Sequence, residues 1–257
     1  MITLIAESKT MSASRQEIFN PQVLTQPIFA KEASALAHSF ASLSVEEIAE
    51  RMMVSMPLAI KTKKLFFDFQ ISDDIKSALT EYTGEVFRAF DAPSLSQDAV
   101  DFSSSRLFII SSLYGMLRAT DLIKPYRFDF DIEFPGSGKT VQKDWKQKIT
   151  IAFVKMLKDR GERDVLDLLP GEAAKCLDWK VIKRFARVMK VNFKTVDDKG
   201  QLKTPYSGKI KELRGKLLRE IVTTHTDRLD EVLTIHTPLL ALDEDSSLKD
   251  YPTFISI

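Results

Sequence analysis

An apolar run that ends in a charged loop constrains the fold of this chain more than any other feature. Residues 107–110, LFII, have the length and composition of a buried strand. Residues 111–127, SSLYGMLRATDLIKPYR, follow directly and carry two arginines, an aspartate, a lysine and two tyrosines. Loops held by a rigid strand often bear binding residues, and the planar forks of Arg118 and Arg127 suit a carboxylate or a phosphate. A structural turn in which Arg118 pairs with Asp121 explains the same residues.

The periodicity of the rest of the chain predicts short strands among amphipathic helices. In the clearest helix, apolar residues recur at helical spacing and Gly161 marks the end. Ser44 and Glu47 form a capping-box pattern at the start of another helix, which should end before Pro57. The predicted strands cover 1–5, 107–110, 126–134, 164–169, 185–196 and 253–257, and the predicted helices cover 28–40, 44–53, 72–82, 142–160 and 207–222. We therefore expect a mixed α/β (α+β) fold with one domain over residues 1–257.

Composition places the chain among ordinary globular proteins. Hydrophobic residues make up 44% of its 257 residues, which is enough for a sizeable core. The single cysteine, Cys176, excludes an internal disulfide and suits a reducing compartment. The first residues lack the basic and apolar regions of a signal peptide, and no apolar run approaches the roughly 18 residues of a membrane helix. We therefore expect a cytoplasmic protein that does not associate with a membrane.

Charge is balanced in total but uneven along the chain. The formal net charge is +1, whereas residues 175–220 hold 14 lysines and arginines against five aspartates and glutamates, a net charge of +9. Such a segment can form a basic face for an anionic partner or simply a solvated surface. Contacts to nucleic-acid phosphates would make binding salt-dependent and largely independent of sequence. The residues of the predicted helix 207–222 that could contact phosphates are Lys209, Lys211, Arg214, Lys216 and Arg219.

Gly215 interrupts this basic helix. A glycine inside a helix costs roughly 0.5–1 kcal/mol relative to alanine, so its presence needs a physical reason. One reason is that the backbone of another element packs closely against it. The other is that the missing side chain lets a phosphate or a second strand approach the helix.

Other motifs suggest chemistry whose requirements they do not meet. Residues 135–140, PGSGKT, resemble the end of a phosphate-binding P-loop, but Glu133 stands at the first required glycine and would repel phosphate. None of the three histidines has a cysteine or histidine at metal-ligand spacing, and the adjacent carboxylates 243–245 cannot all face one cation on regular backbone. Cys176 has no adjacent base to make it a nucleophile. We therefore predict neither a metal site nor a cofactor.

Residues 111–127 resemble the signature SLYG-x-LR-xx-DL-xx-PYR of the YaaA family of bacterial proteins, which is linked to peroxide stress. The resemblance continues in the same order along the chain, where residues 4–10, 84–87 and 242–247 are similar to the family's LISPAKT, GDVY and FDEDSS motifs. It implies a mixed central sheet flanked by helices in a fold particular to the family. It also implies a cytoplasmic protein that binds double-stranded DNA and helps to limit reactive iron. A helix-hairpin-helix element would rest on Tyr114-Gly115-Met116.

Several positions of the family pattern differ in this chain. The Ser-Pro-Ala of the first motif is Ala6-Glu7-Ser8 here. The motif NLAS-x-EY-x-K is DLLPGEAAK at 167–175, which keeps Glu172 and Lys175 among its polar positions. The FN-x-EGY motif is absent, because residues 235–240 read IHTPLL. The fold should therefore carry over more safely than the activity.

The residues and the resemblance together leave three hypotheses open. In the first, the chain is a stress-response protein that binds double-stranded DNA through a basic cleft, without sequence preference. In the second, it is an enzyme or small-molecule binder whose retained charged residues converge on an anionic, nucleotide-like ligand. In the third, it is a structural or partner-binding protein without activity. The residues of the second hypothesis are Lys9, Arg118, Asp121, Tyr126, Arg127, Glu172 and Lys175. We expect the four basic residues of this set to line one cleft, within roughly 10 Å of one another.

Overall fold

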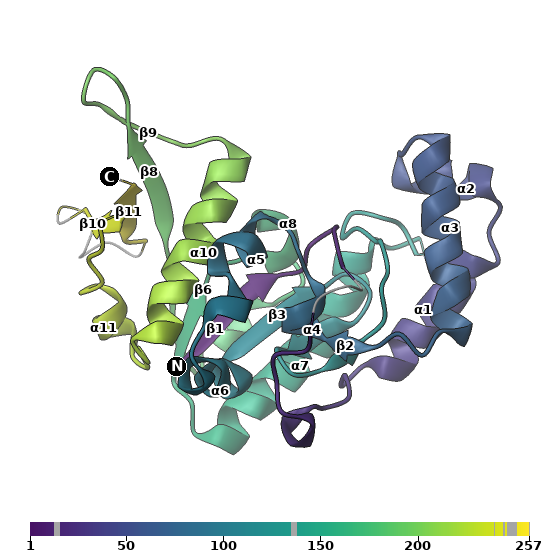
Figure 1. Ribbon diagram of the computed structural model, residues 1–257, viewed down its shortest axis with the longest axis horizontal. Helices are drawn as coiled ribbons and strands as arrows, with labels where there is room; N and C mark the ends of the chain where they lie inside the picture. The colour runs from purple at the N-terminus through teal and green to yellow at the C-terminus, as the bar shows by residue number, and fades with distance from the viewer. Residues whose placement is uncertain (13–15, 135–137, 239, 244, 246–250, 257) are drawn as a thin grey trace.

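Five strands form the central sheet of the computed structural model, which describes residues 1–12, 16–134, 138–238, 240–243, 245 and 251–256 (Figure 1). The strand order is β4-β3-β1-β6-β7. Four of the strands run parallel, whereas β4 returns antiparallel to β3. The bounds are β1 (Ile2–Ala6), β3 (Leu107–Ser111), β4 (Gly115–Arg118), β6 (Asp164–Asp167) and β7 (Arg187–Lys190). The predicted mixed α/β class with a mixed central sheet is confirmed.

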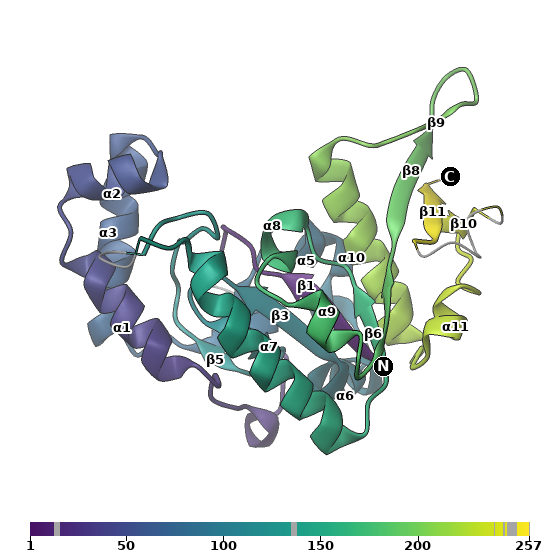
Figure 2. The ribbon, with the colours of Figure 1, turned by 180° about the vertical axis from the view of Figure 1, so that it is seen from behind.

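Helices cover both faces of this sheet. Every residue of β1, β3 and β6 is buried, as expected for parallel strands enclosed between two helical layers. α7 lies across one face, and α5, α6 and α10 lie on the other (Figures 1 and 2). The bounds are α4 (Ala78–Glu81), α5 (Glu85–Phe90), α6 (Gln97–Arg106), α7 (Val141–Arg160), α8 (Gly171–Ala174), α9 (Trp179–Ile182) and α10 (Ser207–Thr223).

α7 confirms the clearest helix prediction. Trp145, Ile149, Phe153 and Leu157 recur every four residues and are all buried, so one stripe of the helix faces the sheet. Gly161 ends the helix in the left-handed conformation, with φ of 67°. Although α7 is the longest of the described helices, its outer face is charged. No helix in the described part of the chain combines the length and the apolar character needed to cross a membrane.

Three helices form an arm at the end of the molecule away from α10 (Figures 1 and 2). They are α1 (Ala30–Ala41), α2 (Val45–Met52) and α3 (Met56–Ile71). The predicted capping box is present, since Ser44 and Glu47 bond each other's backbone N–H at the start of α2. Phe40 of α1 and Phe66 of α3 both pack on Phe128, with ring centroids 4.7 and 5.9 Å away, which ties the arm to the core.

A second sheet lies at the opposite end of the molecule, beside α10 (Figure 1). Its order is β10-β11-β8-β9, and a turn at 197–200 joins β8 to β9 with Gly200 at φ of 76°. The bounds here are β8 (Asn192–Val196), β9 (Leu202–Lys203), β10 (Leu240–Leu242), β11 (Thr253–Ser256) and α11 (Leu229–Val232). The remaining short elements are β2 (Lys76–Ser77), which pairs with β5 (Leu122–Ile123), and the 3-10 turns η1 (Pro21–Val23) and η2 (Ala92–Ser94).

The predicted strand 126–134 is wrong, although the alternation behind it is real. Phe128, Phe130 and Ile132 are buried, but none of the described strands pairs with the segment. The carbonyls of Phe130 and Ile132 instead accept the N–H groups of Gln142 and Val141, at the start of α7. Helix N-termini have four unpaired N–H groups, so this extended segment caps a helix rather than joining a sheet.

Three other segments were also predicted wrongly. The helix expected over 72–82 is largely absent, because β2 pairs with β5 and only α4 is helical there. The helix that precedes it, α3, was not predicted, because proline ordinarily ends a helix, whereas Pro57 occupies the first turn of this one. The strand expected over 185–196 divides at Val191 into β7 and β8, which belong to different sheets.

Gly215 lies where α10 crosses α5. A Cβ atom at this position would lie 2.3 Å from the carbonyl oxygen of Val86 and 2.7 Å from the Cβ of Ala89. The structure therefore selects the close-packing explanation for this glycine. The missing side chain brings α5 and α10 into direct contact.

Candidate functional site

The carboxyl ends of β1 and β6 are neighbours in the sheet, and a cleft opens above them. The chain leaves β1 toward β3 on one side and leaves β6 toward β7 on the other. Diverging connections of this kind create a crevice, which is where ligands bind in open α/β sheets. We call this cavity of about 340 Å³ the β1–β6 cleft. Its lining comprises residues 5–10, 83–88, 129–130, Leu168, Pro170, Glu172, Lys211 and Arg214.

The loop after β1 forms one wall of the cleft. Ser8 Oγ accepts the backbone N–H of Thr10 at 3.1 Å, which turns the loop and presents Lys9. The loop packs closely on the start of α5, because a Cβ on Gly84 would lie 2.3 Å from Ser8 Oγ. Lys9 Nζ lies 2.5 Å from a carboxylate oxygen of Asp129.

α10 supplies the other basic residues of the cleft. Lys211 and Arg214 are three residues apart and so lie on one face of the helix. Burial lowers the pKa of Arg214, and the nearby carboxylates of Asp167 and Glu172 oppose that shift. The cleft therefore holds a partly desolvated guanidinium beside a lysine, which suits recognition of an anion.

Glu7 is one of the acidic residues that line the cleft. Its carboxyl group accepts hydrogen bonds from the hydroxyls of Ser112 and Tyr126, both buried. The Tyr126 hydroxyl lies 2.6 Å from that of Tyr82 and 2.7 Å from Ser111 Oγ, so the network continues into the core. Burial raises the pKa of Glu7 to about 7 against the lowering effect of these hydrogen bonds.

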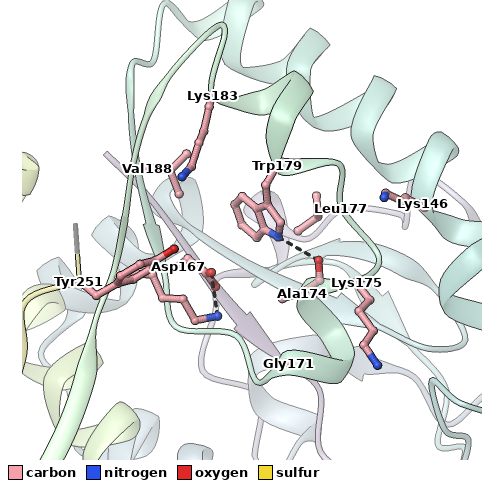
Figure 3. A pocket seen from close by; sticks show the side chains of 11 residues that line it. Lys146, Asp167, Gly171, Ala174, Lys175, Leu177, Trp179, Lys183, Val188 and Tyr251 are labelled. Atoms are coloured by element: carbon pink, nitrogen blue, oxygen red, sulfur yellow. Dashed lines mark hydrogen bonds and ion pairs between the residues drawn. The ribbon is translucent and has the colours of Figure 1, made fainter.

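A second cavity of about 510 Å³ lies beyond α8, above the carboxyl ends of β6 and β7. Trp179 stands at its centre (Figure 3), held by a hydrogen bond from the indole N–H to the carbonyl of Ala174 at 2.9 Å. Lys190 lies 3.2 Å from Asp167, the acidic residue of the lining. We call this cavity the lysine pocket after its basic residues, Lys146, Lys175, Lys183 and Lys190.

The structure divides the seven residues proposed for an anionic ligand. Lys9 and Glu172 line the β1–β6 cleft, and Lys175 lines the lysine pocket. Tyr126 and Arg127 support the cleft from behind, since Tyr126 bonds Glu7 and Arg127 donates to the carbonyl of Lys9 at 3.2 Å. These five residues thus belong to the same edge of the molecule, although they do not form one cavity.

Arg118 and Asp121 lie apart from this edge. Arg118 is opposite Phe108, near the amino end of β3, whereas the cleft lies beyond the carboxyl end of β1. Asp121 is buried and accepts hydrogen bonds from Thr25 Oγ1 at 2.6 Å and from the backbone N–H of Arg118 at 2.8 Å. The expectation that Arg118 lines the cleft is wrong, because this pair holds a turn.

The basic residues of α10 do not form one continuous surface. Lys209 and Lys216 both pair with Glu212, at 3.2 and 2.5 Å. Arg219 donates to the carbonyls of Phe90 and Asp91 at the end of α5, at 2.7 and 3.0 Å. Of the five residues proposed for DNA, Lys211 and Arg214 therefore face the cleft, and the other three have partners within the protein.

The segment 114–116, which was expected to form a helix-hairpin-helix element, is part of a β-hairpin. β3 and β4 pair antiparallel, with Ser111 opposite Gly115. Gly115 has φ of 71°, and a Cβ there would lie 2.9 Å from the ring of Trp145. Tyr114 and Met116 are buried, so this turn does not offer its backbone N–H groups to a phosphate.

The remaining motifs contribute no site among the described residues. Pro135, Gly136 and Ser137 of the glycine loop lie outside them, as do Glu244, Ser246 and Ser247 of the acidic segment. Glu133 approaches Gly138, where its carboxylate would oppose a phosphate. The Cys176 thiol is buried, which raises its pKa to about 12. The described residues contain no group of three or more acidic, histidine or cysteine side chains placed to hold a metal ion.

Comparison with known proteins places the chain in a family. The model of the family "Peroxide stress protein YaaA" matches residues 1–246. The chain belongs to this family. Similar relatives include UPF0246 proteins of Shewanella sp. (strain W3-18-1), 29% identical over 99% of this chain and 98% of the relative, and of Burkholderia mallei (strain SAVP1), 31% identical over 90% and 89%. A UPF0246 protein of Parabacteroides distasonis is 30% identical over 76% of each chain.

Sequence analysis missed the most distinctive residue of the cleft, Glu7. It had appeared as a departure from the Ser-Pro-Ala of the family motif, and its position directly after a buried strand was the available signal. The lysine pocket was missed apart from Lys175, because Lys146 comes from α7 and Lys183 and Lys190 follow β6. Residues so far apart in sequence meet only through the sheet.

Proposed function

We propose that this YaaA family member acts in the cytoplasmic response to peroxide stress by binding a small anionic ligand of nucleotide size in the β1–β6 cleft. One observation carries the proposal: Lys9, Lys211 and Arg214 come from segments some 200 residues apart and line a single cavity. A volume of about 340 Å³ lies in the range of small-molecule sites. The place of the cleft, where strand connections diverge, supports the same assignment.

Calorimetry with inorganic sulfate and with AMP tests this proposal. Each charge-assisted hydrogen bond contributes about 1.5–3 kcal/mol, so the double change Lys211→Ala with Arg214→Ala should weaken binding at least tenfold. The matched control is Lys64→Ala, which removes an exposed lysine from α3 in the arm. Unchanged affinity in the double variant, or no binding of either probe by the parent protein, would reject the proposal.

Double-stranded DNA is a second candidate ligand, favoured by the lysine pocket. Three of its four lysines belong to the segment 175–220 with its charge of +9, and only Asp167 opposes them in the lining. Such a surface would bind phosphates without sequence preference. Replacing Lys146, Lys175 and Lys183 by alanine should then flatten the dependence of log affinity on log salt by roughly two to three units, about 0.9 per lost phosphate contact. An unchanged slope would exclude the pocket, and absence of binding at low salt would exclude DNA.

A further inference from the structure

Glu7 places a carboxyl group in the cleft where the family motif has proline. The residue directly follows β1, and its backbone N–H still bonds the carbonyl of Ile110 at 3.0 Å, so its position is set by the sheet. An ionised carboxylate would repel the anion that the neighbouring basic residues attract. The protonation state of Glu7 therefore matters for the proposed ligand.

The hydrogen bonds around Glu7 do not require a proton on its carboxyl group. Ser111 Oγ accepts the backbone N–H groups of Leu113 and Tyr114 at 3.2 and 2.9 Å, so its own proton goes to the Tyr126 hydroxyl. The proton of Tyr126 is then available to Glu7, as is that of Ser112. Both carboxyl oxygens thus already have donors, and a proton on Glu7 is not needed by either bond.

The charges of the lining balance when Glu7 is ionised. Two of the pairs are internal, Lys9 with Asp129 and Arg88 with Glu85. The four cations of the lining are Lys9, Arg88, Lys211 and Arg214, and the four carboxylates are Glu7, Glu85, Asp129 and Glu172. One proton on Glu7 therefore changes the cleft from formally neutral to a net charge of +1.

The other titratable groups next to Glu7 stay uncharged near neutral pH. Burial and the nearby carboxylate raise the pKa of Tyr82 and Tyr126 well above the usual value, so both phenols stay protonated. Burial, together with the nearby charge of Glu7, raises the pKa of the Cys176 thiol to about 12. Glu7 itself, with a pKa of about 7, is the group at this site that changes charge there.

We propose that the β1–β6 cleft takes its ligand as an oxyanion, a phosphate ester or a carboxylate, that accepts a hydrogen bond from the protonated carboxyl of Glu7. Binding is then coupled to uptake of one proton, so affinity falls as Glu7 ionises. A neutral acid that donates to an oxyanion adds a directed bond to the attraction of Lys211 and Arg214. This inference rests on the proposed function and specifies the ligand class and the role of Glu7.

Sulfate is the appropriate probe, because its charge does not change between pH 6 and pH 8 as that of phosphate does. Carbon-13 NMR of the glutamate carboxyls, assigned with Glu7→Gln, should show that Glu7 titrates near pH 7. The midpoint of this titration should rise when sulfate is added. A rise of about one unit corresponds to about fivefold tighter sulfate binding at pH 6 than at pH 8. Glu7→Gln should remove this difference and bind sulfate at pH 8 about fivefold more tightly than the parent protein.

The matched control is Glu172→Gln, which removes an exposed carboxylate from the same cleft. It should strengthen sulfate binding equally at both pH values and keep the fivefold difference. Titration of Glu7 near pH 4.5, or equal sulfate affinity at both pH values in the parent protein, would overturn the inference but not the proposed function. If neither sulfate nor AMP binds at pH 6 or at pH 8, both the inference and the proposed function are overturned.

Discussion

At the scale of the residue, a group's surroundings decide its chemistry more than its type does. Glu7 and Glu17 are both glutamates with hydroxyl donors around them, yet their pKa values shift in opposite directions. Burial dominates at Glu7, whereas Glu17 accepts the backbone N–H groups of Ser77 and Phe19, which lower its pKa despite burial. Neither outcome can be assigned from the two residues' sequence positions.

Glu7 should make the stability of the protein fall as pH rises. Its pKa is about 7 in the native state and 4.5 for an ordinary glutamate, so the native state binds more protons between these values. The free energy of unfolding therefore decreases across that window, by about 2 kcal/mol between pH 5.5 and pH 8. Urea denaturation of the parent and of Glu7→Gln at both pH values measures this contribution, which the glutamine variant lacks.

The control for this prediction is Glu172→Gln in the same cleft. Its stability should follow that of the parent protein at both pH values, so that the difference between the two stays constant. If Glu7→Gln and the parent protein show the same pH dependence, the raised pKa of Glu7 is refuted.

At the scale of the element, helix contacts determine where glycine is required. α10 carries Gly208 and Gly215, but only Gly215 lies against backbone of another helix. Gly208 faces the ring of Tyr206, an exposed side chain that can move. The same residue type in the same helix thus has a packing role at one position and not at the other.

Replacing Gly215 by alanine should destabilise the protein by about 1–3 kcal/mol. The added methyl group would lie 2.3 Å from the carbonyl oxygen of Val86, which forces α5 and α10 apart. This cost exceeds the roughly 1 kcal/mol that alanine gains from helix propensity. Chemical denaturation measures the difference, with Gly208→Ala as a matched control that should be neutral or slightly stabilising. Equal effects of the two substitutions would contradict the close packing.

At the scale of the whole molecule, the arm and the second sheet stand at opposite ends of the central sheet (Figures 1 and 2). The segment 175–220, which runs from the end of α8 into α10, carries the net charge of +9 and joins β7 of the central sheet to β8 and β9 of the second sheet. Arg106, the residue before β3, forms two ion pairs at the amino ends of the central strands. It pairs with Glu162, which precedes β6, and with Asp227, which precedes α11. Three distant segments therefore meet at one guanidinium.

Replacing Arg106 by alanine should lower the free energy of unfolding by about 1–3 kcal/mol. The Glu162 side chain is 16% exposed and would lose one of its two charge partners in a partly desolvated position, keeping the N-terminal ammonium of Met1 at 3.1 Å. Urea denaturation provides the measurement. Lys155→Ala is the control, since its pair with Asp159 is largely exposed and should contribute less than about 0.5 kcal/mol. A loss no larger than that of the control would show that Arg106 does not hold these segments together.

The sequence by itself determined the parts of this protein that depend on local pattern. Buried strands such as Leu107–Ser111, the stripe of α7 and the capping box of α2 follow from hydrophobic periodicity and from hydrogen bonds within a few residues. The signature at 111–127 also indicated the family, which the match over residues 1–246 confirms. These features need no knowledge of what lies across the molecule.

Tertiary structure alone decided where the extended segments go and which charged residues meet. The segment 126–134 caps α7 instead of pairing as a strand, because the free N–H groups of that helix lie beside it. Arg118 and Lys9 lie at opposite ends of the central sheet, because Arg118 ends the antiparallel strand β4 beside the amino end of β3 and Lys9 follows the carboxyl end of β1. Glu7, Lys211 and Arg214 meet through the crossing of α10 over the sheet. Desolvation and charge act through space, so the cleft and the shifted pKa of Glu7 exist only once the chain has folded.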